Sequence, residues 1–194
     1  MMAAFAFLRD AKNEQRDPEM WARVRAAVLR EADFYIEGSD QMAYKFIRHP
    51  DAPISWGTGA YGNHLRPVLA AWFLTGDPKY RDWTIRTCDN ALGANPLGLC
   101  WITGLGERTI RAPLHNSRYR PEGTVIDGLQ GEGPWSAGGG YNYKETVYPA
   151  HDRFFASMHT FVDCHFAIGM DEGIVNNQVI DMAVFGLLLP DSNP

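Results

Sequence analysis

Long apolar runs are missing from the sequence, and no stretch approaches the ~20 residues that a membrane-spanning helix needs. We therefore expect no membrane partner. The first residues, Met1 to Leu8, are apolar, but they lack the basic region and the cleavage site of a signal peptide. The cellular location stays unknown on this basis, with the cytoplasm as the default.

Cysteine is also scarce. The 3 cysteines, Cys88, Cys100 and Cys164, are odd in number and far apart, so they form neither a Cys-x-x-Cys pair nor a disulfide framework. We expect them to be small hydrophobic residues that stay reduced.

One group of residues superficially suggests a metal site. It comprises His151, Asp152, His159, Asp163, Cys164 and His165. The spacing matches no established ligand pattern, and the i, i+4 pairing expected on a helix is incomplete. We therefore expect structural roles for these residues, with no bound metal and no cofactor.

Positive charge is neither abundant nor concentrated. The formal net charge is −5, and the 18 Lys and Arg residues form no stripe that could neutralise phosphates. No glycine-rich loop follows a strand, because Gly57-Thr58-Gly59 and Gly138-Gly139-Gly140 have the character of turns. These absences argue against nucleic acid as a partner. Aromatic residues, by contrast, reach 12%, and those in loops are typical of surfaces that stack on sugars.

The remaining pattern is mostly helical. Asp17 followed by Pro18 predicts a helix N-cap with proline at the first helical position, and Gly38-Ser39 predicts the end of this helix. Between these points runs one apolar stripe of Trp21, Val24, Val28, Ala32 and Tyr35.

Two further helices are expected after this one. The first runs from about Asn63 to Phe73, with Pro67 in its first turn, where a missing N–H group costs little. Gly76-Asp77-Pro78 then supplies a helix stop, a new N-cap and a new first helical position. The next helix, which Gly93 closes, carries an amphipathic stripe of Tyr80, Trp83, Thr84, Thr87, Cys88, Ala91 and Leu92.

Residues 94–150 have a different character, because they are rich in glycine, proline and aromatic residues without helical periodicity. Such a long span is usually functional or disordered, and its many aromatic and hydrophobic residues favour an ordered, functional loop. Helical patterns return at about 152–165 and 173–189, and Pro190 ends the last one. No internal repeat or linker is visible, so the sequence predicts one all-α domain over residues 1–194.

Four short motifs occur in order from about Trp56 to the C-terminus. They are Trp56-Gly57-Thr58-Gly59 before the helix that ends at Leu74–Tyr80, the D-x-x-L-G-x-N-P segment Asp89–Gly98, the I-T-G-x-G stretch Ile102–Arg108 followed by His115 and Arg118, and Met170-Asp171-Glu172. In this order they resemble the C-terminal half of the catalytic domain of family 9 glycoside hydrolases, the inverting cellulase-like family.

The resemblance implies an (α/α)6 toroid of helical hairpins, with the active site in a cleft formed by loops at one end. Twelve helices of about 12 residues need ~144 residues, and their connections need ~50 more. With the long loop added, the total exceeds the 194 residues present, so we expect about half of the toroid. Such a half exposes apolar helix faces and is expected to self-associate or to need the missing N-terminal half.

Glu172 is the candidate general acid that the resemblance implies. Inverting hydrolysis uses two carboxyl groups roughly 6.5–9.5 Å apart, one of which donates a proton to the glycosidic oxygen. The apolar neighbours of Glu172 favour its protonated form, whereas a position just before a helix favours the charged form. The alternative is that Asp171-Glu172 is only a charge pair at the start of a helix.

The resemblance also assigns substrate-binding residues. His115 and Arg118 match a histidine and an arginine that contact substrate in the family, and arginine offers a rigid fork of donors. Trp101, Trp135 and Tyr141 are candidate stacking platforms for sugar rings. Anchoring of the loop is the alternative role for these aromatic residues.

Three departures from the family pattern stand beside this assignment. Arg118 follows His115 by three residues, whereas the family usually has His-x-Arg. The acid motif is Asp-Glu in place of Asn-Glu, and a competing register matches Asn176-Asn177 to that pair, which puts an amide at the acid position. No Asp-x-x-Asp pair occurs in the sequence, so the base motif of the family has no counterpart.

Two main hypotheses of function follow. The first is part of an inverting glycoside hydrolase that cleaves β-glycosidic bonds in a glucan-type polysaccharide or oligosaccharide, and that is incomplete as an isolated chain. The second is a non-catalytic carbohydrate-binding or assembly module derived from such an enzyme. A third option, another helical-toroid enzyme such as a lyase, would need a Tyr/His or Asn/His pair in place of Glu172.

Overall fold

The computed structural model describes residues 1–49, 64–113, 122–124, 126, 161, 163, 173 and 183–189. The chain falls into two compact units, the first comprising Met1–Pro50, Asn63–Arg86 and Pro194, and the second comprising Asp51–Gly62 and Thr87–Asn193. Regular structure in the described ranges is helical, apart from one isolated β-bridge between Cys100 and Thr109. None of the helices found there is both long and apolar enough to cross a membrane.

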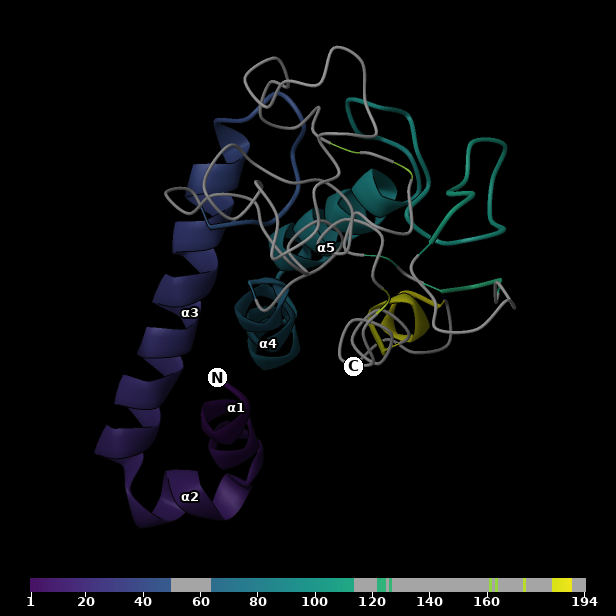
Figure 1. Ribbon diagram of the computed structural model, residues 1–194. Helices are drawn as coiled ribbons and strands as arrows, with labels where there is room; N and C mark the ends of the chain where they lie inside the picture. Colours follow the sequence, from purple (N-terminus) through teal and green to yellow (C-terminus); the bar gives the residue numbers. More distant parts are fainter. Residues whose placement is uncertain are drawn as a thin grey trace, which may run out of the picture. The chain divides into compact units, whose positions relative to one another are not determined.

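The first unit is built around one long helix. Its elements are α1 (Met2–Arg9), α2 (Ala11–Arg16), α3 (Pro18–Asp40), α4 (Leu65–Thr75) and the first part of α5 (Pro78–Ala91). α3 packs against α1, α2 and α4, and Figure 1 shows α4 alongside it and the two short helices at its N-terminal end. These elements confirm the predicted all-α class.

α3 begins where the sequence predicts. The side chain of Asp17 accepts a hydrogen bond from the Met20 N–H group at 2.9 Å, and Pro18 is the first helical residue. The helix ends at Asp40, just beyond the stop expected at Gly38-Ser39. The predicted cap and proline therefore fix this boundary as expected.

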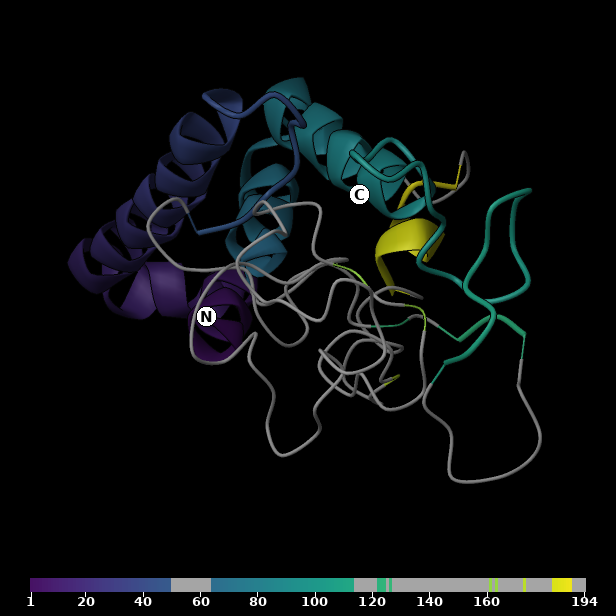
Figure 2. The ribbon, with the colours of Figure 1, turned by 45° about the horizontal axis from the view of Figure 1, so that its top comes forward.

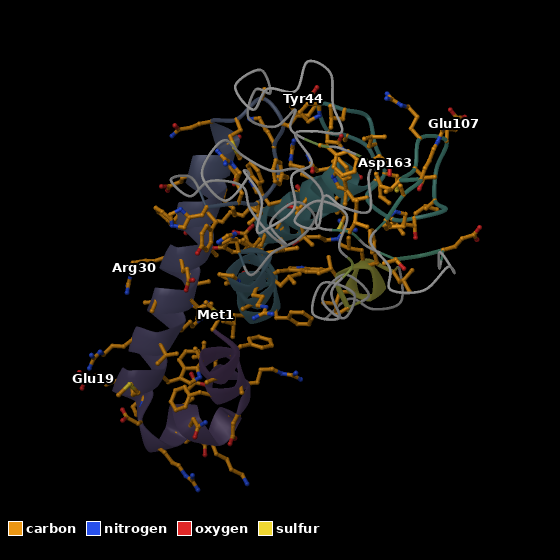
Figure 3. All side chains as sticks on the ribbon, viewed as in Figure 1. Met1, Glu19, Arg30, Tyr44, Glu107 and Asp163 are labelled. Carbon is orange, nitrogen blue, oxygen red and sulfur yellow. The ribbon has the colours of Figure 1, made fainter. Side chains whose placement is uncertain are left out.

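The two sides of α3 differ in polarity. Val28 and Ala32 of the predicted stripe are buried. Glu19 and Arg30 are exposed and project from the side that faces away from α1 and α4 (Figure 3). The helix is thus amphipathic, as the periodicity predicts.

The core of the first unit joins α1, α3 and α4. Its buried residues are Leu8, Val28 and Ala70, and the partly buried side chains packed against them are Met1, Ala4, Phe5, Phe7, Trp21, Val24 and Leu74. The Nε1 group of Trp21 also donates a hydrogen bond to the Leu8 carbonyl oxygen at 3.3 Å. The apolar start of the chain is therefore a helix folded back on α3 (Figure 2), a feature that was not predicted from the sequence.

The junction between α4 and α5 also follows the prediction. Gly76 has a φ of 67°, and its N–H group donates to the Trp72 carbonyl oxygen at 2.8 Å, which ends α4. The side chain of Asp77 accepts a hydrogen bond from the Lys79 N–H group at 2.9 Å, and Pro78 opens α5. Glycine is suited to this stop because the left-handed conformation costs it no steric strain.

In the second unit, α5 gives way to turns. Ala91 is its last residue and is buried, whereas Leu92 is 43% exposed, and Gly93 has a φ of 126°. Residues 94–113 contain no helix, which agrees with the change of character predicted at residue 94. The helices expected at 152–165 and 173–189 lie mostly outside the described residues, but residues 183–187 are helical.

Candidate functional site

The Asp89–Gly98 motif shapes the turn that leaves α5. Asn95 is buried, and its Nδ2 group donates hydrogen bonds to the carbonyl oxygens of Asn90 and Leu99, both at 2.7 Å. Its Oδ1 atom accepts hydrogen bonds from the N–H groups of Leu97 at 3.2 Å and Leu99 at 3.3 Å. A side chain that both donates and accepts is required here, so the asparagine of the motif organises the loop.

The Ile102–Arg108 motif forms a tight loop that Thr109 closes. The Oγ1 group of Thr109 donates to the Ile102 carbonyl oxygen at 3.0 Å and accepts a hydrogen bond from the Gly104 N–H group at 3.0 Å. Gly104 has a φ of 76°, and a Cβ atom at this position would lie 2.7 Å from Cγ of Glu122. Both conditions call for glycine at this place in the motif.

Trp101 is fully buried, with 0% of its surface exposed. The backbone N–H group of Trp101 donates to the Ala91 carbonyl oxygen at 2.9 Å, and its backbone carbonyl oxygen accepts from the Ile126 N–H group at 3.0 Å. Its indole ring packs against the ring of Phe161, with centroids 5.0 Å apart. This burial favours the loop-anchoring alternative, because a buried ring presents no face to a sugar.

Asp163 attaches its own segment to the same loop. Its Oδ2 atom accepts a hydrogen bond from the Arg111 N–H group at 2.8 Å, and its Oδ1 atom accepts one from the Ala112 N–H group at 2.6 Å. Figure 3 shows Asp163 beside this part of the chain. The structural role that the sequence predicts for Asp163 therefore takes a specific form, in which one carboxylate holds two consecutive backbone N–H groups.

Most of the candidate site residues lie outside the part of the chain that the structure describes. These are the acid Glu172, the hydrogen-bonding residues His115 and Arg118, and the aromatic residues Trp135 and Tyr141. The same holds for His151, Asp152, His159, Cys164 and His165. The roles assigned to these residues from the sequence stay predictions.

The two described cysteines behave as small hydrophobic residues. Cys88 and Cys100 are both buried. Burial raises the pKa of the Cys100 thiol, so this side chain stays protonated at neutral pH. Within the described ranges, no three His, Cys, Asp or Glu side chains are grouped closely enough to hold a metal ion.

A cluster of four rings in the first unit was not predicted from the sequence. His64 contacts Tyr35 at 5.1 Å and His49 at 5.9 Å between ring centroids, and Phe34 contacts both Tyr35 at 5.5 Å and His49 at 5.6 Å. Burial lowers the pKa of His64, and the neighbouring His49 lowers it further. The pKa of Tyr35 is raised by burial and then by the charge of Glu31. The cluster therefore favours a neutral imidazole at His64.

The fold of the chain is found in known structures. The chain shares the (α/α)6 toroid fold of family 9 glycoside hydrolases and covers a part of it. It matches the structure of AaCel9A in complex with cellobiose-like isofagomine over 95% of this chain and 34% of that one, with a TM-score of 0.75 and 21% identity. A metagenome-derived family 9 endoglucanase matches over 97% of this chain and 32% of its own, with a TM-score of 0.73 and 21% identity.

The sequence comparison points to the same family. The chain is 29% identical over 118 residues to BoGH9A, a xyloglucan-specific endo-beta-1,4-glucanase of Bacteroides ovatus. The matched region covers 59% of this chain and 20% of that protein. No protein-family model matches the chain. The predicted resemblance to family 9 glycoside hydrolases is thus confirmed, and the chain spans about a third or less of the length of these relatives.

Proposed function

We propose that the chain is the C-terminal part of an inverting glycoside hydrolase that cleaves β-1,4 bonds in a glucan. The observation that carries this proposal is the match of 95–97% of the chain to family 9 structures, with the four motifs in family order. The similarity to a xyloglucan-specific β-1,4-glucanase supports the substrate class.

Glu172 is the general acid in this proposal. Its protonated carboxyl group donates to the glycosidic oxygen as the bond to the anomeric carbon breaks. An aspartate from outside this sequence takes a proton from the water that attacks the opposite face, so the anomeric configuration inverts. His115 and Arg118 hydrogen-bond the sugar hydroxyl groups, and Trp135 and Tyr141 stack on the rings.

A non-catalytic carbohydrate-binding or assembly module is the second candidate. It is favoured by the run Asn176-Asn177-Gln178, which supplies only amides where the competing register places the acid. The absence of an Asp-x-x-Asp pair from this sequence points the same way. In this case the aromatic loop binds the glucan but does not hydrolyse it.

Measurements of binding and turnover on this chain test what the two candidates have in common. Titration calorimetry with cellohexaose and with xyloglucan oligosaccharides measures binding, and release of reducing ends measures hydrolysis. Both candidates predict binding and little or no hydrolysis by this chain alone. An absence of binding would contradict both candidates. Appreciable turnover by the chain alone would contradict the proposal that the catalytic base lies outside this sequence.

The coding sequence before Met1 supplies the second arm of the test. If it encodes an Asp-Ala-Gly-Asp-like motif, the longer protein is expected to hydrolyse β-1,4-glucan. Glu172→Gln in that protein then lowers kcat at least about 100-fold, as expected for loss of a general acid. The control Glu107→Gln removes an exposed carboxylate and keeps activity. Full activity of Glu172→Gln would show that another residue is the acid.

A further inference from the structure

Asp163 connects two segments of the second unit that are far apart in the sequence. Its two carboxylate oxygens accept the N–H groups of Arg111 and Ala112 at 2.8 and 2.6 Å. Hydrogen bonds to an ionised carboxylate are shorter and stronger than neutral ones. Because each oxygen holds one of two consecutive N–H groups, the direction of the backbone at Arg111 and Ala112 is fixed relative to Asp163.

A second contact attaches the same segment to the same loop. Phe161, two residues before Asp163, packs on the buried indole of Trp101. One attachment is apolar and the other is a charged hydrogen-bonded pair. Two attachments of different chemistry prevent the loop from turning about either one alone.

The backbone that Asp163 holds lies shortly before the candidate sugar-binding residues in the sequence. His115 and Arg118 follow Ala112 by three and six residues. Asp163 itself is exposed, so its hydrogen bonds compete with water and contribute little to overall stability. The main consequence of these bonds is therefore local order at Arg111 and Ala112.

We infer that Asp163 is a positioning residue for carbohydrate binding. By holding the N–H groups of Arg111 and Ala112, it sets the direction in which the chain enters the segment that carries His115 and Arg118. This inference rests on the proposed function, because it requires that those two residues contact a glucan. Without the carboxylate, part of the binding free energy is consumed in ordering this stretch of backbone.

The test compares two substitutions of Asp163 with a matched control. Asp163→Ala removes both acceptors, whereas Asp163→Asn keeps one and turns an N–H₂ group toward the other donor. Glu107→Gln is the control, because it removes the same charge from an exposed side chain that projects into solvent (Figure 3). The dissociation constant for cellohexaose is measured by calorimetry, and the exchange of the Arg111 and Ala112 amide protons is measured by NMR.

Asp163→Ala is expected to weaken cellohexaose binding about tenfold, the cost of ordering about one residue of backbone on binding. Asp163→Asn is expected to be intermediate, and Glu107→Gln is expected to bind like the wild type. In both Asp163 variants the two amide protons exchange faster. If the alanine variant fails to fold, the asparagine variant supports the same comparison.

The outcomes separate this inference from the proposed function. Faster exchange with wild-type affinity would overturn the positioning role. Unchanged exchange would overturn the hydrogen-bonded arrangement itself. A wild-type chain that binds no cellohexaose would overturn the proposed function and this inference with it, whereas the exchange measurement needs no ligand.

Discussion

The indole ring of Trp101 packs on the phenyl ring of Phe161, with ring centroids 5.0 Å apart and ring planes inclined at 56°. Inclined arrangements at this separation are favourable for aromatic pairs. Trp101 also bonds through its backbone to Ala91 at the end of α5 and to Ile126. Trp101, which directly precedes the Ile102–Arg108 motif, therefore joins three separate segments of the second unit.

This arrangement predicts that Trp101 acts on stability more than on binding. Trp101→Ala is expected to lower the free energy of unfolding by about 3–5 kcal/mol, as for other large core side chains. Trp101→Phe keeps a ring against Phe161 and removes an indole N–H that has no hydrogen-bond partner among the described residues, so its cost stays below about 2 kcal/mol. Denaturant unfolding measures both values.

Glucan binding by the same variant decides between the two roles of Trp101. If Trp101 anchors the loop, Trp101→Phe binds cellohexaose like the wild type at temperatures where both are folded. A variant with normal stability but a clear loss of affinity would instead identify Trp101 as a stacking platform. Calorimetry on the two proteins under identical conditions makes the comparison.

Local features of the sequence predicted the helix boundaries because each depends on a few neighbouring atoms. Asp17 and Asp77 cap their helices with their own side chains, and Gly76 takes the left-handed conformation that stops α4. The start of α4 was predicted near Asn63 and lies at Leu65. A weak cap explains this difference, since no side chain there bonds the first turn.

Relations between distant residues were beyond the reach of such patterns. α1 and α2 have 8 and 6 residues, too few turns to display a stripe, and short helices depend on packing against the rest of the protein. The bonds from Asp163 to Arg111 and Ala112 join segments that no local pattern connects. The family motifs identified the loop, but the buried role of Asn95 emerged only from its hydrogen bonds.

The cap of α3 provides a prediction about local stability. Asp17→Ala removes the acceptor of the Met20 N–H group and is expected to cost about 1 kcal/mol of unfolding free energy. Asp10→Ala is the matched control, because Asp10 caps α2, which has 6 residues and no buried side chain. We expect a smaller effect there. Equal costs in urea unfolding would contradict the view that α3 is the principal helix of the first unit.

Gly104 and Gly123 form a natural pair for testing the motif loop. Both have positive φ angles, 76° and 79°, but only at Gly104 would a Cβ atom meet Glu122, whereas Gly123 has open space. Each alanine substitution carries the backbone cost of about 1–2 kcal/mol. Gly104→Ala is expected to cost more, because Glu122 must also move. Thermal unfolding compares the stability of the two variants. An equal loss of stability would mean that the Glu122 side chain moves aside at no cost.

Acid is expected to destabilise the chain through His64. The pKa of its imidazole is lowered, first by burial and then by His49, from an unperturbed value of 6.5. Below pH 6.5 the unfolded chain therefore binds a proton at this residue that the folded chain does not. As the pH decreases from this value, the free energy of unfolding decreases, until the pH reaches the lower pKa of the folded chain. Above pH 6.5 this contribution is fully present.

The substitution His64→Phe isolates this effect, because it keeps an aromatic ring against Tyr35 and removes the titration. Urea unfolding of both proteins between about pH 5 and 8 measures the difference in stability as a function of pH. We expect the wild type to lose stability relative to the variant as the pH falls below 6.5, and the two curves to run parallel above it. Parallel curves over the whole range would mean that His64 is protonated as readily in the folded chain as in the unfolded one. The ring cluster would then be open to water in solution, and its packing could not be what keeps the imidazole neutral.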